Sequence, residues 1–189
     1  SNINDLLFTS NPKITKSGFY NNYEFIIKNA NTDGKKSKNF KDDENFYLSG
    51  LLQFNSSMPM KKENTNYDNV LKPKLSIKLA PNHTKNYEDD EVVININNIF
   101  SLDRISKNDT VEGGVSLAYG FDYLFLNKGS EKEILSFKAA NNLRLSENED
   151  LTNSYQIGEK TSNFFTESIY TPNDFLSIKY SNALRNNFS

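Results

Sequence analysis

Large apolar and polar side chains alternate along the segment 115–125. Its odd positions carry bulky apolar or aromatic groups, namely Val115, Leu117, Tyr119, Phe121, Tyr123 and Phe125. Its even positions are small or polar apart from Leu124, namely Ser116, Ala118, Gly120 and Asp122. Because successive side chains of a strand point to opposite faces, this segment is predicted to be a strand with one strongly apolar face. Such a face must be covered by a second protein layer or by lipid.

The same alternation recurs along much of the chain. It is clear in 19–28, 46–55, 71–79, 135–145 and 176–185, and weaker in 163–170. No segment carries apolar residues at helical spacing over a helical length. The pattern therefore predicts an all-β protein with about seven or eight strands of roughly nine to eleven residues, the length of a tilted membrane-spanning strand. Strands of soluble proteins are usually shorter, about five or six residues.

The connections between these strands alternate in length. Two short turns are predicted, at Asn127–Ser130 with Gly129 and at Thr171–Asp174 with Pro172. Long polar loops are predicted at 30–45, 60–70, 81–114 and 146–162. Short turns on one side and long loops on the other are typical of outer-membrane barrels. We therefore expect antiparallel up-and-down strands that form part of a large transmembrane β-barrel, with residues 1–189 as a single fragment of that barrel domain.

Composition supports this expectation and narrows the function. Hydrophobic residues make up 36% of the 189 residues, and no apolar run approaches the roughly 18 residues of a spanning helix. A barrel tolerates such a polar chain because half of every strand faces water. The net charge of −2 gives no indication of a nucleic-acid partner. The absence of cysteine excludes disulfides, thiolate nucleophiles and cysteine-based metal sites.

Little in the sequence indicates catalysis. His83 is the only histidine, and it lies in a predicted loop outside the patterned strands. A hydrolase on such a scaffold needs a paired nucleophile and base. We therefore expect no enzyme activity, no cofactor and no metal site, and we interpret His83 and the acidic runs 42–44 and 88–91 as solvated loop residues.

One cation and two carboxylates lie close together in the predicted loop 81–114. They are Arg104, Asp109 and Glu112. We hypothesise that this loop folds into or over the lumen and that Arg104 pairs with Asp109 or Glu112 to hold it there. The alternative is that the three charges are solvated independently, because surface ion pairs often contribute little.

The segment 98–120 resembles one family. It carries Asn98, Phe100, Arg104, Asp109, Glu112 and Gly113, followed by a strand with Tyr119 and Gly120. This spacing is similar to that in the barrel of the outer-membrane lipopolysaccharide-assembly family LptD, also called organic solvent tolerance protein. Leu71–Leu75 is similar to the strand that precedes this loop in the family, so the close resemblance covers 71–125. The Asn- and Lys-rich style is similar to versions from marine alphaproteobacteria, and the cysteines of some members are absent.

The resemblance implies a location in the outer membrane of a Gram-negative bacterium and transport of lipopolysaccharide into its outer leaflet. It also implies three further features: a periplasmic bridge that delivers lipopolysaccharide, a lipoprotein plug subunit (LptE-like) and a lateral opening to membrane lipid. Nothing in the chain resembles the periplasmic domain of the family, so we expect a middle portion of a larger barrel.

The strand pattern also selects polar residues that we expect to face the lumen. They are Lys72, Lys74, Lys78, Asp122, Lys138 and Arg144, together with Glu24. The lysines and the arginine among them are suited to bind lipid phosphates. The alternative is that these charges only keep the lumen surface of the barrel hydrated. Two other functions stay open: a different outer-membrane barrel, such as a porin or receptor, and a soluble β-sandwich binding module. A sandwich requires a second sheet over the apolar faces.

Overall fold

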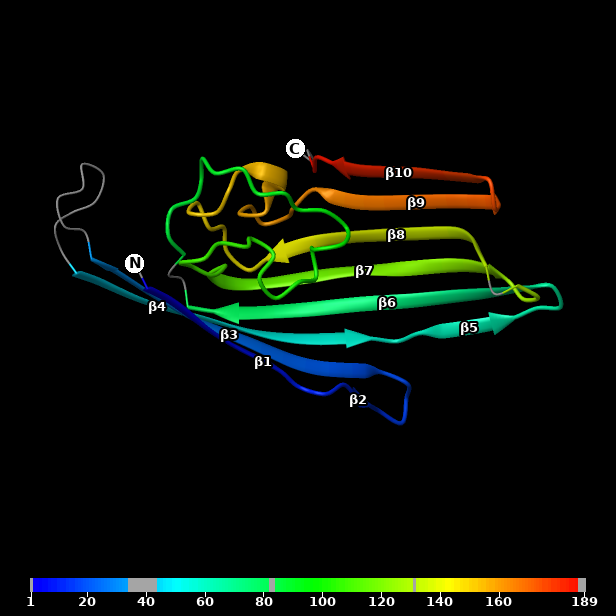
Figure 1. Cartoon of the computed structure of the whole chain (residues 1–189), viewed down its shortest axis with the longest axis horizontal. Coiled ribbons are helices and arrows are strands. Elements are labelled where there is room, and N and C mark those ends of the chain that lie inside the picture. Colours follow the sequence, from blue (N-terminus) through cyan, green and yellow to red (C-terminus); the bar gives the residue numbers. More distant parts are fainter. Residues whose placement is uncertain (1, 34–43, 82–83, 131, 187–189) are drawn as a thin grey trace.

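The computed structural model describes residues 2–33, 44–81, 84–130 and 132–186, and it places all the described strands in one sheet (Figure 1). The strands are β1 (Asn2–Thr9), β2 (Lys13–Ile14), β3 (Tyr20–Asp33), β4 (Glu44–Ser57), β5 (Met60–Glu63), β6 (Tyr67–Ala80), β7 (Gly114–Asn127), β8 (Glu133–Arg144), β9 (Phe164–Asn173) and β10 (Leu176–Leu184). Each strand of the order β1-β3-β4-β6-β7-β8-β9-β10 is antiparallel to its neighbours. The predicted all-β, up-and-down arrangement is therefore confirmed.

A short 3₁₀ turn, η1 (Ser154–Gln156), is the helical element that the described residues contain. Within those residues no helix has the length and apolarity that a membrane span requires.

Two of the ten strands are continuations of others. β5 pairs with β6 in the register that β4 began, and the break between them lies at Met58 and Pro59. Pro73 of β6 lies opposite this break, where its carbonyl accepts the Met58 amide at 3.1 Å. A proline cannot donate to a ladder, and here its missing N–H lies beside an interrupted strand, where no ladder hydrogen bond is lost. In the same way β2 continues β1 along β3, which leaves eight long strands.

The strand register collects the apolar side chains on one face, which we call the outer face. Leu52 lies opposite Leu79, and Leu79 lies opposite Val115 on the next strand. Aromatic rings of neighbouring strands contact each other on this face: Phe8–Phe25, Tyr23–Phe54, Tyr67–Phe125 and Phe121–Phe137, with ring centroids 4.8–5.9 Å apart. Such cross-strand pairs stabilise a sheet and fix its register.

No second sheet covers the outer face within the described part of the chain. Tyr119 is 41% exposed and Tyr23 is 54% exposed, although both are large aromatic residues on strands that pair on both sides. The opposite face, which we call the inner face, buries polar residues such as Gln53, Ser76 and Lys78. A soluble sandwich has the reverse arrangement. The described residues therefore do not form the sandwich alternative, in which a second sheet covers the apolar face.

The two ends of the sheet differ in their connections. At one end lie only short turns, including 64–66 and the turn after Asn127, whose Oδ1 accepts the Gly129 amide at 3.0 Å. The long connections 81–113 and 145–163 both lie at the other end (Figure 1). In the described residues the short turns and the long connections thus lie at opposite ends of the sheet.

Three predicted boundaries are wrong. The predicted loop 60–70 is instead the hairpin of β5 and β6, because backbone pairing outweighs the polar composition of this segment. The predicted loop 30–45 is too long at both ends, because β3 continues to Asp33 and β4 starts at Glu44. Positions 34–43 are outside the described residues. The turn predicted at Thr171–Asp174 lies further on, at 174–175, with Pro172 near an irregularity in the pairing of β9 with β10.

Both long connections fold back over the inner face at the loop end. Apolar residues of the connection 81–113, such as Ile94 and Ile99, join Leu151 and Ile157 of the connection 145–163 in one core. The sheet meets them with Ala118, Ala140 and Phe165. A smaller core joins Leu102 and Val111 to Ile26 and Leu51 of the sheet. The small residues at even positions of β7 therefore make room for the connection that packs on them.

Candidate functional site

A cluster of charges is buried between the connection 81–113 and the inner face. Arg104 donates to both carboxylate oxygens of Glu112, from Nη2 to Oε1 at 2.5 Å and from Nε to Oε2 at 2.7 Å. Arg144 of β8 donates from Nη1 to Oε1 of Glu112 at 2.6 Å. Lys78 of β6 places its Nζ 3.5 Å from Oε2. The hypothesis that Arg104 pairs with one of the two nearby carboxylates is confirmed for Glu112.

Three cations surround one carboxylate in this cluster. All four side chains are almost completely withdrawn from solvent, with side-chain exposures of 0–2%. Backbone and side-chain amide oxygens accept hydrogen bonds from Arg104 and so stabilise part of the excess positive charge. Arg104 Nη1 donates to the Ile99 carbonyl at 3.1 Å and to Asn142 Oδ1 at 2.9 Å. A buried cluster of this kind needs every partner, because one missing charge leaves the others unpaired in a poorly polarisable interior.

The same cluster joins the two long connections. Arg144 Nη2 donates to the carbonyl of Gly113, and the amide of Gly113 donates to Thr84 Oγ1 at 2.7 Å. Asn148 of the connection 145–163 donates from Nδ2 to the same Thr84 Oγ1 at 3.1 Å. Gly114 follows with φ +85°, a left-handed conformation that favours glycine, and turns the chain into β7. The cluster therefore fixes both connections to the start of β7.

Asp109 belongs to a different, partly exposed contact. Its carboxylate accepts from Lys85 Nζ at 2.7 Å and from the Tyr87 hydroxyl, so it does not pair with Arg104. Lys85 in turn lies over the Tyr47 ring, 4.6 Å from its centroid. Asp103 holds a further point of the connection 81–113 to the sheet, since it accepts from Lys28 of β3 at 2.5 Å.

The ionisation of these carboxylates predicts how pH acts on the connection 81–113. Burial raises the pKa of Glu112, but the positive charges of Arg104 and Lys78 outweigh it and hold the pKa well below the ordinary 4.5. A pKa that is lower in the folded state stabilises that state above the ordinary value, and the stabilisation is lost as the pH falls below it. Glu112 should therefore keep its charge from about pH 8 to about pH 5. Its titration should leave hydrogen–deuterium exchange of the segment 81–113, corrected for intrinsic rates, unchanged in that range, and exchange should increase only at lower pH. Release of the segment between about pH 7 and about pH 5 would contradict this assignment.

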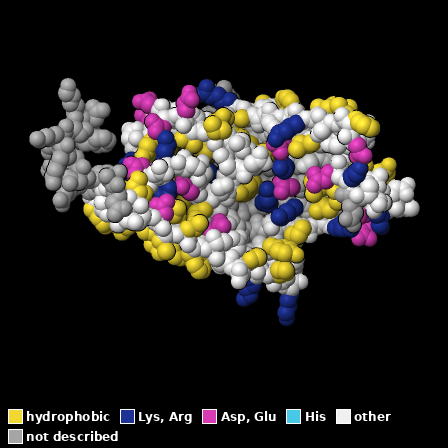
Figure 2. Space-filling model, viewed as in Figure 1, with side chains coloured by type: hydrophobic (Ala, Val, Ile, Leu, Met, Phe, Trp, Pro, Cys, Tyr) yellow, Lys and Arg dark blue, Asp and Glu magenta, His cyan; other side chains and the backbone are white. Residues whose placement is uncertain are grey.

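A row of alternating charges crosses the inner face nearer the turn end. In register, Lys72 of β6 lies opposite Asp122 of β7, which lies opposite Lys138 of β8, which lies opposite Glu167 of β9. Asp122 forms an ion pair with Lys74, whose Nζ lies 2.8 Å from Oδ1, and Glu167 forms ion pairs with Lys138 at 3.2 Å and Lys179 at 2.8 Å. Figure 2 shows the Lys and Arg atoms beside the Asp and Glu atoms near the centre of this face. The inner face is thus strongly charged along this row, which crosses β6, β7, β8 and β9.

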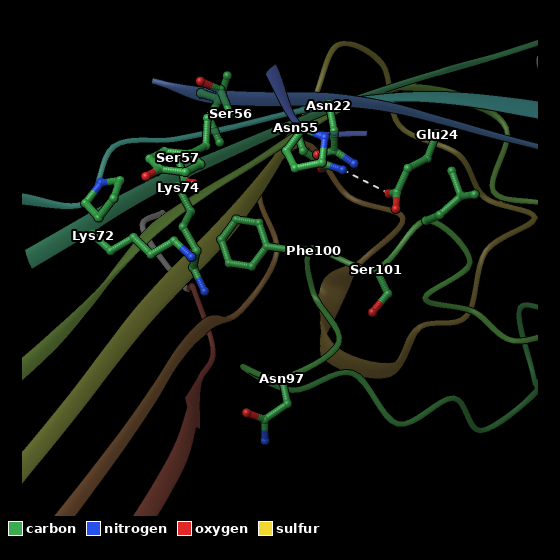
Figure 3. A pocket seen from close by; sticks show the side chains of 15 residues that line it. Asn22, Glu24, Asn55, Ser56, Ser57, Lys72, Lys74, Asn97, Phe100 and Ser101 are labelled. Carbon is green, nitrogen blue, oxygen red and sulfur yellow. Dashed lines mark hydrogen bonds between the residues drawn. The ribbon is translucent and has the colours of Figure 1, made fainter. Parts of the chain in front are cut away.

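A groove of about 830 Å³ lies between this row and the tip of the connection 81–113. Lys72 and Lys74 line one part of it and extend toward Phe100, whereas Asn22, Glu24 and Asn55 line another part (Figure 3). The Lys74 ammonium group lies 4.6 Å from the centroid of the Phe100 ring. The Phe100 carbonyl accepts the Gln53 side-chain amide at 2.9 Å, which fixes this tip over the sheet.

The structure separates the other residues that the sequence singled out. Asn98 shapes a turn, where its Oδ1 accepts the Asn95 amide at 2.8 Å. Tyr119 lies on the outer face, away from the cluster. Gly120 allows close packing, because a Cβ there would lie 2.2 Å from the Ala139 carbonyl oxygen. His83 is outside the described residues. Lys72, Lys74, Lys78, Asp122, Lys138 and Arg144 all lie on the inner face, as does Glu24.

A comparison with protein families shows to which family the chain belongs. The family model described as LPS transport system D, LptD, matches residues 20–188. The chain belongs to the LptD family. LptD proteins transport lipopolysaccharide and assemble it at the outer membrane of Gram-negative bacteria, so this chain is part of an outer-membrane transport protein and not of an enzyme. The family also decides against a porin or receptor. A search among curated proteins finds no match to the chain.

Several residues of this LptD chain contribute to the site without having been singled out by the sequence. Thr84 and Asn148 bridge the two connections, and Gln53 and Lys28 hold the connection 81–113 to the sheet. Their residue types are common in exposed loops and on polar strand faces, so nothing in the sequence distinguished them. Glu167 carried a weak signal, because it occupies a polar position of the segment 163–170.

Proposed function

We propose that this chain forms a continuous part of the LptD barrel wall, with its inner face toward the lumen through which the sugar portion of lipopolysaccharide passes. The observation that carries the proposal is the inverted distribution of side chains. Large apolar groups such as Tyr119 are exposed on the outer face, whereas charged groups such as Lys78 are buried on the inner face. A membrane-spanning barrel with a polar interior requires this distribution.

The connection 81–113 then lies inside the barrel at the loop end. Its tip at Phe100 and its anchor at Arg104 both pack against the inner face. A folded segment of this kind reduces the open cross-section of the lumen while the groove beside it stays accessible. The polar groups of the groove and of the charged row are suited to sugar hydroxyls and phosphates.

The proposal includes partners beyond this chain. The unpaired edges at β1 and β10 need further strands, because an open edge cannot remain in lipid. By the family resemblance, a lipoprotein plug (LptE-like) and a periplasmic bridge complete the transport path. The similarity in style to marine alphaproteobacteria stays a prediction, which the family match does not support.

Photocrosslinking from adjacent residues on opposite faces tests the proposal. A crosslinker is placed at Lys138, on the inner face, or at Phe137, on the outer face, in the complete barrel in phospholipid vesicles supplied with lipopolysaccharide by the bridge proteins. We expect lipopolysaccharide to be captured at Lys138 during transport, and phospholipid acyl chains to be captured at Phe137. Capture of lipopolysaccharide at Phe137 without any at Lys138 would overturn the proposal.

A further inference from the structure

We propose that the groove between Phe100 and β6 is a binding site for a phosphorylated sugar, with Lys72 as the residue that selects the phosphate. The inference rests on the proposed function, because it assigns one step of the transit to named residues. The distribution of charge within the groove, and not the mere presence of lysines on the wall, supports it.

The two lysines of the groove differ in their partners. Lys74 forms an ion pair with Asp122 at 2.8 Å and lies against the Phe100 ring. Lys72 faces the same part of the groove, yet its ammonium group makes no ion pair or hydrogen bond with any residue that the structure describes (Figure 3). Asp122, the carboxylate opposite Lys72, is thus already paired with Lys74. Lys72 therefore retains a charge that an anionic ligand can neutralise. A phosphate is the anion that best uses such a donor.

The remainder of the groove offers groups for a sugar ring. The Asn55 side chain donates to Glu24 Oε2 at 2.9 Å, and Gln53 donates to the same oxygen at 3.2 Å. Both protein donors therefore use one oxygen, and Glu24 Oε1 is left for hydroxyl donors. Asn22 and Ser101 add further polar groups to the lining. Carboxylate, amide and hydroxyl groups that surround an aromatic side chain match the chemistry of a carbohydrate, whereas an inorganic phosphate requires the lysine alone.

The groove is a built feature and not a gap between strands. Its floor is the polar face of β3, β4 and β6, and one wall is the tip of the connection 81–113. That tip is fixed by the hydrogen bond from Gln53 to the Phe100 carbonyl and, four residues later, by the buried Arg104. Because this wall is fixed at both points, the distance between Lys72 and the polar groups around Glu24 stays constant. A constant distance favours a ligand that carries both a phosphate and sugar hydroxyls.

The test compares lipopolysaccharide with and without its lipid A phosphates in the complete barrel. Capture is measured with one photocrosslinker at Ser101 in the groove and, separately, one at Lys138. We expect capture at Ser101 to favour the phosphorylated form about tenfold, in line with a hydrogen bond to a charged group. Lys72→Gln should abolish that preference and Lys72→Arg should retain it. Lys62→Gln, which removes an exposed lysine of β5 outside the groove, should leave the preference unchanged.

Competition distinguishes a phosphorylated sugar from phosphate alone. Glucosamine 1-phosphate should reduce capture at Ser101 at lower concentrations than inorganic phosphate does, and equal competition would overturn the sugar assignment. Capture at Lys138 with no phosphate preference at Ser101 would overturn the role of Lys72 while the proposed function stands. Absence of lipopolysaccharide at both positions would overturn the proposed function itself. Heat-modifiable migration of each variant establishes that its barrel has folded.

Discussion

Replacing Glu112 by glutamine should release the connection 81–113 from the inner face of the sheet. The substitution keeps the size of the side chain but removes the negative charge among Arg104, Arg144 and Lys78. Loss of one partner from a buried ion pair costs about 3–5 kcal/mol, because the remaining charges stay buried without compensation. Deuterium exchange of the amides in 81–113 should therefore increase strongly, while exchange in β7 and β8 should change little.

Asp109→Asn is the matched control for this substitution. Asp109 lies in the same connection and forms an ion pair with Lys85, but its side chain is 34% exposed. An ion pair in contact with solvent contributes about 0–1 kcal/mol, so exchange in 81–113 should stay close to that of the parent protein. Equal effects of the two substitutions would mean that the buried cluster does not hold this connection in place.

A lysine on the outer face should destabilise the barrel far more than a lysine on the inner face of the same strand. Phe121 lies near the middle of β7 on the outer face, so Phe121→Lys would place a charge in hydrocarbon. Such a charge costs about 2–4 kcal/mol near the bilayer midplane. We expect a lower yield of folded protein and a shift of its unfolding to lower denaturant concentration in lipid vesicles.

Leu124→Lys provides the comparison, since it adds the same charge to β7 on the opposite face. Leu124 lies opposite Val70 and Ser136 on the inner face, next along that face to the charged pair of Asp122 and Lys138. The variant should fold with a yield and stability close to those of the parent protein. A larger loss of stability for Leu124→Lys than for Phe121→Lys would mean that the faces have been assigned the wrong way round.

The sequence predicts the strands well because their alternation is a direct consequence of the two faces. Segment 115–125 shows this most clearly, and it lies inside β7 (Gly114–Asn127). β1 was missed for the same reason, because Leu6, Leu7 and Phe8 are consecutive and give no alternation. The polar segment 60–70 was mistaken for a loop, because backbone hydrogen bonds between β5 and β6 form whatever the side chains are.

The buried cluster could be predicted only in part. Arg104 and Glu112 are eight residues apart, so their pairing was within reach of sequence reasoning. The participation of Lys78 and Arg144 depends on the register in which both lie opposite Ser116, and that register is set by contacts across three strands. The groove depends on the same long-range placement, because the tip at Phe100 folds over β3, β4 and β6.

The exposure of residues along β7 to lipid and to water tests the central claim most directly. The chain has no cysteine, so single cysteines for spin labels are introduced at Tyr119, Phe121 and Tyr123, and at Asp122 and Leu124, in the complete barrel in bilayers. We predict that the three odd positions collide with oxygen dissolved in the hydrocarbon, and that the two even positions collide with a water-soluble nickel chelate. Odd positions protected from both reagents would show that protein covers the outer face, which contradicts the account.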